Sequence, residues 1–268
     1  MTIRKGLSKM TALVSYKSAD GVAIVIIDNP PMNVLSQQVQ KELKETVTTL
    51  EKDDDIICVV LTTPGDKVFI AGADIKEFPN MIDNPNMRED VMAMHDVLTS
   101  LEDMTKPTII VLDGLTLGGG CELALAFDIR IAEEHTQIGL PEVNLGIFPG
   151  GGGTQRLPRL IGSARAKEMM FTGEPISSSK AEEIGLINKV VSTGEGLNTA
   201  MELASKIAGK SLQSLSRLKK AVDEGVEKSL SEGIEREVTL FEEVFQTEDA
   251  KEGVAAFIEK RKANFTHK

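Results

Sequence analysis

Short apolar runs alternate with amphipathic segments along the first two thirds of the chain. The runs are rich in β-branched residues and are bounded by glycine, proline or aspartate, which is typical of buried strands. They lie at residues 21–27, 56–61, 68–70, 108–112, 129–132 and 137–139. Between them, residues 36–50 and 86–104 have apolar side chains at helical spacing, and Ser36 can cap the first of these helices. Strand, helix and strand in this order predict an α/β fold with a parallel sheet covered by helices.

From residue 163 onward the pattern is mostly helical, with one further strand predicted at residues 187–191. The predicted helices cover residues 164–171, 179–183, 197–208, 211–223, 232–245 and 249–262. The last two helices have wide apolar faces, which include Phe241, Val244, Phe245, Ala256 and Phe257. Faces of this size exceed what one small helical unit can bury. We therefore expect this region to pack on another copy of the chain.

Two turns made of small residues indicate where a ligand approaches the backbone. The apolar run 108–112 leads to three consecutive glycines at residues 118–120, and residues 121–126 then have helical composition. The first N–H groups of a helix have no partner within it and lie at the positive end of the helix dipole. This turn is therefore a candidate site for negative charge. Residues 69–75 form the second turn, in which Asp74 can cap the following segment.

Two glutamates accompany these turns. Glu122 lies in the first turn of the predicted helix, and Glu142 follows Pro141 twenty positions later. Taken alone, Glu122 is a carboxylate stabilised by the helix dipole, and Glu142 is a solvated loop acid. Two carboxylates beside a backbone site for negative charge instead indicate acid–base chemistry on a carbonyl compound.

The glycine-rich segment at residues 141–154 is predicted to be a loop. It differs from a P-loop because Gln155 follows Gly153 and Thr154, where a P-loop needs glycine, lysine and then serine or threonine. The dinucleotide-binding glycine pattern also fails at Gly118. The sequence therefore argues against nucleotide hydrolysis and hydride transfer.

Composition narrows the class of protein further. The 268 residues are 41% apolar, and no apolar run approaches the ~20 residues that a membrane-spanning helix needs. A net charge of −11 argues against a nucleic-acid partner, because phosphate binding needs clustered lysine and arginine. Residues 1–10 are basic but lack the apolar segment of a secretory signal, which leaves a basic tip or a cleaved organellar leader.

The cysteines and histidines suggest a reducing compartment and no metal. Cys58 falls in a predicted strand and Cys121 in the glycine turn, so their placement does not resemble a disulfide scaffold, and we expect a cytoplasmic protein. His95, His135 and His267 are far apart and form no metal-ligand spacing. His95 lies on the apolar face of a predicted helix, where we expect it to serve in packing.

Several separated motifs resemble those of the crotonase, or enoyl-coenzyme A (CoA) hydratase/isomerase, superfamily, and most closely those of its hydratases. They lie at residues 69–77, 117–123, 141–142, 149–156 and 252–260. They occur in the right order and span nearly the whole chain. The resemblance implies a crotonase-like spiral of ββα repeats at residues 1–195, which holds an acyl-CoA site. It also implies a C-terminal helical region at residues 196–268 that forms a homotrimer, often paired into a hexamer.

The resemblance also implies roles for individual residues. The backbone N–H groups of Ala73 and Gly119 would form an oxyanion hole for the thioester oxygen. The adenine and pantetheine path would be lined by Ala71, Asp74, Ile75 and Lys76. Two further residues, Phe241 and Lys260, match positions that reach the nucleotide end from a neighbouring protomer in hydratases. Acyl-CoA is then the substrate, and no cofactor is expected.

The predicted activity is the reversible addition of water to a trans-2-enoyl-CoA, giving a 3-hydroxyacyl-CoA, in fatty-acid or branched-chain acyl degradation. Water must reach C3 while C2 takes a proton, and charge accumulates on the thioester oxygen. We favour Glu122 for the water and Glu142 for the C2 proton, although coupled carboxylates can titrate as a pair. Because many isomerases of this superfamily lack one of the two acids, the presence of both favours hydration.

Other functions stay open at this point. A hydratase of the methylglutaconyl type and an enoyl-CoA isomerase have similar motifs. A noncatalytic RNA- or CoA-binding protein is another possibility, but the net negative charge of the chain argues against RNA binding. A serine peptidase on a related spiral fold would need a Ser–His–Asp arrangement, and no sequence context here marks a serine nucleophile. The length of the acyl chain is also open. We expect the wall of the acyl pocket to come from residues 81–94 and the C-terminal helices.

Overall fold

The computed structural model of the chain describes residues 4–5, 12–65 and 67–268. Of residues 4–5 it describes only the backbone. The basic N-terminal segment, on which the choice between a tip and a leader depends, therefore lies almost entirely outside the described residues. No helix within the described ranges is long and apolar enough to cross a bilayer.

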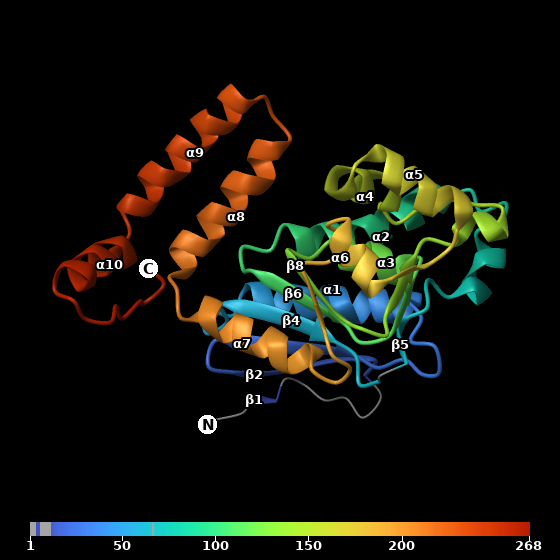
Figure 1. The fold of residues 1–268 in the computed structure, drawn as a ribbon, viewed down its shortest axis with the longest axis horizontal. Coiled ribbons are helices and arrows are strands. Elements are labelled where there is room, and N and C mark those ends of the chain that lie inside the picture. The colour runs from blue at the N-terminus through green and yellow to red at the C-terminus, as the bar shows by residue number, and fades with distance from the viewer. Residues whose placement is uncertain (1–3, 6–11, 66) are drawn as a thin grey trace.

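The described strands form two sheets (Figure 1). The larger sheet has the order β1-β2-β3-β4-β6-β8-β11 and contains β1 (Arg4–Lys5), β2 (Val14–Ala19), β3 (Val22–Ile27), β4 (Cys58–Thr62), β6 (Thr108–Leu112), β8 (Ile129–Glu133) and β11 (Lys189–Val191). The smaller sheet has the order β10-β9-β7-β5 and contains β5 (Val68–Ile70), β7 (Leu115–Leu117), β9 (Gln137–Gly139) and β10 (Ile176–Ser177). Neighbours from β3 to β11 run parallel, which confirms the predicted parallel sheet.

The α-helices are α1 (Gln37–Glu51), α2 (Met87–Glu102), α3 (Gly119–Leu125), α4 (Gly153–Ile161), α5 (Ser163–Thr172), α6 (Ser178–Glu183), α7 (Gly196–Ala208), α8 (Leu212–Val226), α9 (Leu230–Phe245) and α10 (Glu248–Ile258). Two short 3-10 helices, η1 (Ile75–Asn80) and η2 (Glu142–Leu145), follow β5 and β9. The predicted caps are confirmed: Ser36 accepts the N–H of Val39, and Asp74 accepts that of Lys76. Helix α4 was missed, because Gly153 begins it and Pro158 lies inside it.

The chain visits the two sheets in turn. Each of β4, β6 and β8 in the larger sheet is followed by β5, β7 or β9 in the smaller one, and then by helical segments. This repetition is the spiral of ββα units that the sequence motifs implied. Because β5, β7 and β9 are parallel neighbours, the turns that follow them meet at one edge of the smaller sheet.

Helices cover both faces of the larger sheet. In β4, Val59 and Leu61 contribute to a core with α1, α2 and α3, whereas Val60 faces a second core formed with Ala200 and Ala204 of α7. A parallel sheet buried on both faces explains the continuous apolar runs. Helix α7, on the C-terminal side of the predicted boundary at residue 196, therefore packs on the sheet. The helices that extend away from the core begin with α8 (Figure 1).

Helices α8, α9 and α10 form an arm in which large apolar side chains are exposed. They include Leu218, Val222, Val226, Leu230, Ile234, Val238, Phe241, Phe245, Val254, Phe257 and Ile258. Ala256, by contrast, is buried. The arm is attached to the core by Lys219, whose Nζ lies 3.0 Å from a carboxylate oxygen of Asp128.

Candidate active site

The turns after β5 and β7 place the backbone N–H groups of Ala73 and Gly119 close together. A Cβ atom on Gly119 would lie 3.4 Å from the nitrogen of Ala73. Gly118 adopts a φ of +51°, which favours glycine, and donates its N–H to the carbonyl of Gly139 at 2.9 Å. The two N–H groups predicted to act as a pair therefore share one edge of the smaller sheet.

Glu122 is buried in the first turn of α3 and is held by the glycine-rich loop. Its Oε1 accepts the N–H of Gly151 at 2.7 Å and that of Gly153 at 2.8 Å. Burial raises the pKa of the carboxyl, while these two N–H groups, His95 and Arg156 oppose the rise. With Oε1 occupied by two donors, Oε2 is the oxygen left to act on a ligand.

Glu142 begins η2. It follows Pro141 and lies three residues after the end of β9. Its Oε1 would lie 2.9 Å from a Cβ on Gly118, so the carboxyl touches the glycine turn. Its Oε2 is buried and has no hydrogen-bond partner in the described part of the chain. Burial, together with the charge of Glu122, raises the pKa of Glu142 to about 7. A carboxyl with this pKa can give or take a proton near neutral pH.

His95 and Arg156 are neighbours of this site that sequence reasoning did not assign to it. His95 is only half-buried, and its Cε1 would lie 3.7 Å from a Cβ on Gly152. The histidine therefore borders the loop that holds Glu122, in addition to the packing role that we expected. Its position depends on how α2 packs beside α3, which spacing along the sequence does not reveal.

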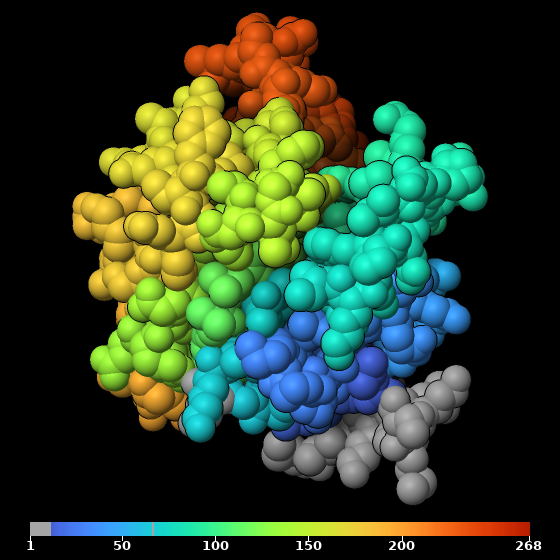
Figure 2. Space-filling view, turned by 90° about the vertical axis from the view of Figure 1, so that its right-hand side faces the viewer, coloured from blue at the N-terminus to red at the C-terminus, as the bar shows by residue number. Residues whose placement is uncertain are grey.

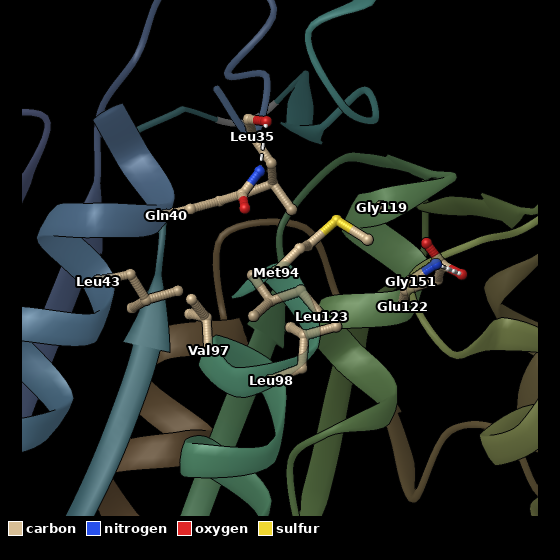
Figure 3. A pocket seen from close by; sticks show the side chains of 10 residues that line it. All are labelled: Leu35, Gln40, Leu43, Met94, Val97, Leu98, Gly119, Glu122, Leu123 and Gly151. Atoms are coloured by element: carbon tan, nitrogen blue, oxygen red, sulfur yellow. Dashed lines mark hydrogen bonds between the residues drawn. The ribbon is translucent and has the colours of Figure 1, made fainter. Parts of the chain in front are cut away.

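A small apolar pocket opens beside Glu122 (Figure 3). It is lined by Leu35, Gln40, Leu43, Met94, Val97, Leu98, Gly119, Glu122, Leu123 and Gly151. Of the wall expected at residues 81–94, only Met94 contributes, and the other contributions of α2 come from Val97 and Leu98. The C-terminal helices do not line it. The pocket therefore places apolar side chains beside Gly119 and Glu122.

The residues proposed for the CoA path divide into two groups. Ala71, Asp74, Ile75 and Lys76 lie with Ala73 on the segment after β5. Figure 2 shows this side of the molecule, with the yellow-green segment around η2 beside the teal segment of η1 and α2. Phe241 lies in α9 and Lys260 just after α10, and both of these helices lie on the opposite side of Figure 1 from β5. One chain alone does not bring them to the site.

A spiral fold that brings two backbone N–H groups near the buried Glu122 and the half-buried Glu142 is typical of an enzyme, and it suits acid–base chemistry on a carbonyl compound. The family model for enoyl-CoA hydratase/isomerase matches residues 17–268, and the chain belongs to this family. It is 41% identical over 242 residues to a short-chain-enoyl-CoA hydratase of Clostridium acetobutylicum, covering 90% of this chain and 92% of the relative.

Two further relatives agree with this assignment. A crotonyl-CoA hydratase of Syntrophomonas wolfei is 41% identical over 256 residues, covering 95% of this chain and 98% of the relative. The crystal structure of an enoyl-CoA hydratase from Bacillus anthracis superposes with a TM-score of 0.91 at 37% identity, covering 96% of this chain and all of that one. The likeness therefore extends over both the core and the arm.

Proposed function

We propose that this protein is an enoyl-CoA hydratase, a hydro-lyase that adds water to a short trans-2-enoyl-CoA. The observation that carries the proposal is the position of Glu122 and Glu142 around the adjacent N–H groups of Ala73 and Gly119. The relatives named as short-chain-enoyl-CoA and crotonyl-CoA hydratases support the same activity.

The first task of the site is to hold the thioester oxygen. The N–H groups of Ala73 and Gly119 would both donate to it, and their donation strengthens as the carbonyl becomes an enolate. Losing one such preorganised donor typically costs about 3 kcal/mol of transition-state stabilisation. Both donors are backbone groups, so their aim depends on the turns after β5 and β7 and not on any side chain.

The two carboxyls divide the proton transfers. Glu122, ionised and held through Oε1, would take a proton from water through Oε2 while the water oxygen bonds to C3. Glu142, protonated at the start, would give its proton to C2. The product leaves Glu122 protonated and Glu142 ionised, and an exchange of protons restores the starting state. One proton is thus shared by the pair throughout.

The pocket supports a short, uncharged acyl group. Its lining is apolar except for the Gln40 amide and Glu122, and the Gln40 amide already donates to the carbonyl of Leu35 at 3.3 Å. The described residues that line it include no cation to pair with a second carboxylate. This argues for a crotonyl-type substrate over a methylglutaconyl one. We place the CoA along Ala71, Asp74, Ile75 and Lys76, with no further cofactor.

The pH dependence follows from the shared proton. Hydration needs the pair to hold one proton, and so does dehydration of the product. We expect kcat/KM in both directions to fall about tenfold per pH unit above a midpoint near pH 7, where the pair loses its last proton. Rates for crotonyl-CoA and 3-hydroxybutyryl-CoA over pH 5–9 measure this. A flat profile from pH 6 to 9 would contradict the role given to Glu142.

The exposed face of the arm supports a homotrimer or a pair of trimers. Most of the large apolar side chains named above on α8, α9 and α10 are more than half exposed in one chain, as Phe257 is at 85%. A second copy would bury them and could carry Phe241 and Lys260 to the nucleotide end of its neighbour's site. We expect sedimentation at the mass of three or six chains, and a monomer at micromolar concentration would contradict this arrangement.

The direct test is the loss of the conjugated enoyl-thioester absorbance when purified protein is added to crotonyl-CoA. Rapid loss with crotonyl-CoA, weaker activity on long or methylglutaconyl thioesters, and formation of a 3-hydroxyacyl product are expected. A folded protein that only moves the double bond would instead be an isomerase. The buried, unpaired thiols of Cys58 and Cys121 support the cytoplasm as its location.

A further inference from the structure

The loop at residues 150–153, which holds Glu122, has no side chains that could fix its backbone conformation. Residues 150–153 are all glycine, and Gly152 adopts a φ of +101°. The backbone at Gly151 comes so close to Glu122 that a Cβ there would collide with Oε2 of this carboxylate, so the position requires glycine. Four consecutive glycines are flexible unless other groups fix them. The two N–H donors of this loop nevertheless aim at one carboxylate oxygen.

Arg156, on the first turn of α4, is in contact with this loop. Its Nη1 lies so close to Gly152 that a Cβ there would collide with it, and it donates to the carbonyl of Gly151 at 3.4 Å. The side chain is 15% exposed. The peptide units of the loop are therefore confined between the guanidinium on one side and Glu122 on the other.

The guanidinium is fixed in turn by Glu102 at the end of α2. Nη2 donates to Oε2 of Glu102 at 2.7 Å, and Nε lies 3.1 Å from the same oxygen. This forked geometry orients a planar group in a way that a lysine ammonium cannot reproduce. Helix α2 also supplies Met94 and His95 to the same region. The ion pair thus ties the loop to the helix that forms the pocket wall.

We propose that Arg156, gripped by Glu102, is a positioning residue that locks the glycine loop against Glu122 and so aims the free oxygen of Glu122 at the attacking water. This inference rests on the proposed function, because it assigns a water-activating role to Glu122. Arg156 itself does not touch the substrate. It acts through the backbone of Gly151 and Gly153.

Several charged or titratable groups face Glu122 from the elements around it. They are His95 from α2, Arg156 from α4, Glu142 from η2 and Cys121 from α3 itself. Among them, Arg156 lowers the pKa of Glu122 and also organises the two N–H donors that lower it. Removing the guanidinium should therefore raise the pKa of Glu122. The acidic limb of the rate profile should move to higher pH, because Glu122 must be ionised to act.

Three variants of the full-length protein test the proposal. With crotonyl-CoA, Arg156→Met should lower kcat roughly 10- to 100-fold with little change in KM, and should move the acidic limb to higher pH. Arg156→Lys keeps the charge but loses the fork, so kcat should fall and the acidic limb should move less than in Arg156→Met. Arg159→Met, one turn along α4 and paired with Glu227 at the surface, is the matched control and should behave as wild type.

A second readout separates this proposal from the proposed function. The titration of a 13C-labelled Glu122 carboxyl, assigned with Glu122→Gln, should shift to higher pH in Arg156→Met whether or not the protein hydrates crotonyl-CoA. If Arg156→Met does not fold, Glu102→Gln, at a half-exposed position, should lower kcat roughly threefold or more. Wild-type kcat in Glu102→Gln and Arg156→Lys, or an unshifted Glu122 titration in folded Arg156→Met, would overturn the proposal.

Discussion

Glu122→Gln and Glu142→Gln are each expected to slow the hydration of crotonyl-CoA by about 10²- to 10⁴-fold, the usual contribution of a general acid or base. A glutamine at position 122 can still accept the N–H groups of Gly151 and Gly153 through its amide oxygen, but it cannot take a proton from water. A glutamine at position 142 cannot give a proton to C2. The loss should appear mainly in kcat, because the thioester oxygen is held by backbone groups that neither change removes.

The double variant distinguishes a working pair from two independent residues. Because both carboxyls act in one transition state, the loss in Glu122→Gln/Glu142→Gln should be smaller than the product of the two single losses. Glu202→Gln, exposed on α7 at the other face of the sheet, is the matched control and should keep wild-type activity. Near-normal turnover in either single variant would remove that glutamate from the mechanism.

Gly120→Ala is expected to destabilise the fold by about 3 kcal/mol and to lower kcat about 100-fold. A Cβ at this position would lie 2.5 Å from the carbonyl oxygen of Ile70 and 2.8 Å from its Cβ. Since that oxygen belongs to the backbone of β5, the strand and α3 must move apart. Ala73 follows β5 and Gly119 begins α3, so the same movement separates the two N–H donors.

Thermal unfolding at matched protein concentration and the crotonyl-CoA assay together check this prediction. Gly209→Ala is the matched control, because Gly209 has a φ of −76° and its Cβ would come no closer than 3.6 Å to other atoms. We expect it to be neutral or slightly stabilising, through the lower entropy of the unfolded chain. Equal stability of the two alanine variants would contradict the close packing of α3 on β5.

The sequence predicted most of the elements that build this site, and its errors have identifiable causes. The apolar runs at residues 56–61 and 108–112 matched buried parallel strands because burial on both faces leaves no polar alternation. The strand β2, which lies between β1 and β3, was missed because its Lys17 and Ser18 interrupt the apolar pattern. The spiral order of the repeats came from the family resemblance, since local patterns do not specify which sheet a strand joins.

The sequence by itself determined the local features of this protein: parallel strands, the caps at Ser36 and Asp74, the glycine turn before Glu122, and an arm with more apolar surface than it can bury. Local features follow from the period of apolar residues and from backbone preferences, which act over a few residues. Only the tertiary structure decided that Gly151 and Gly153 donate to Glu122 and that Arg156 pairs with Glu102. These contacts join segments about 30 residues or more apart, and they exist because parallel strands bring their carboxyl ends to one edge of a sheet.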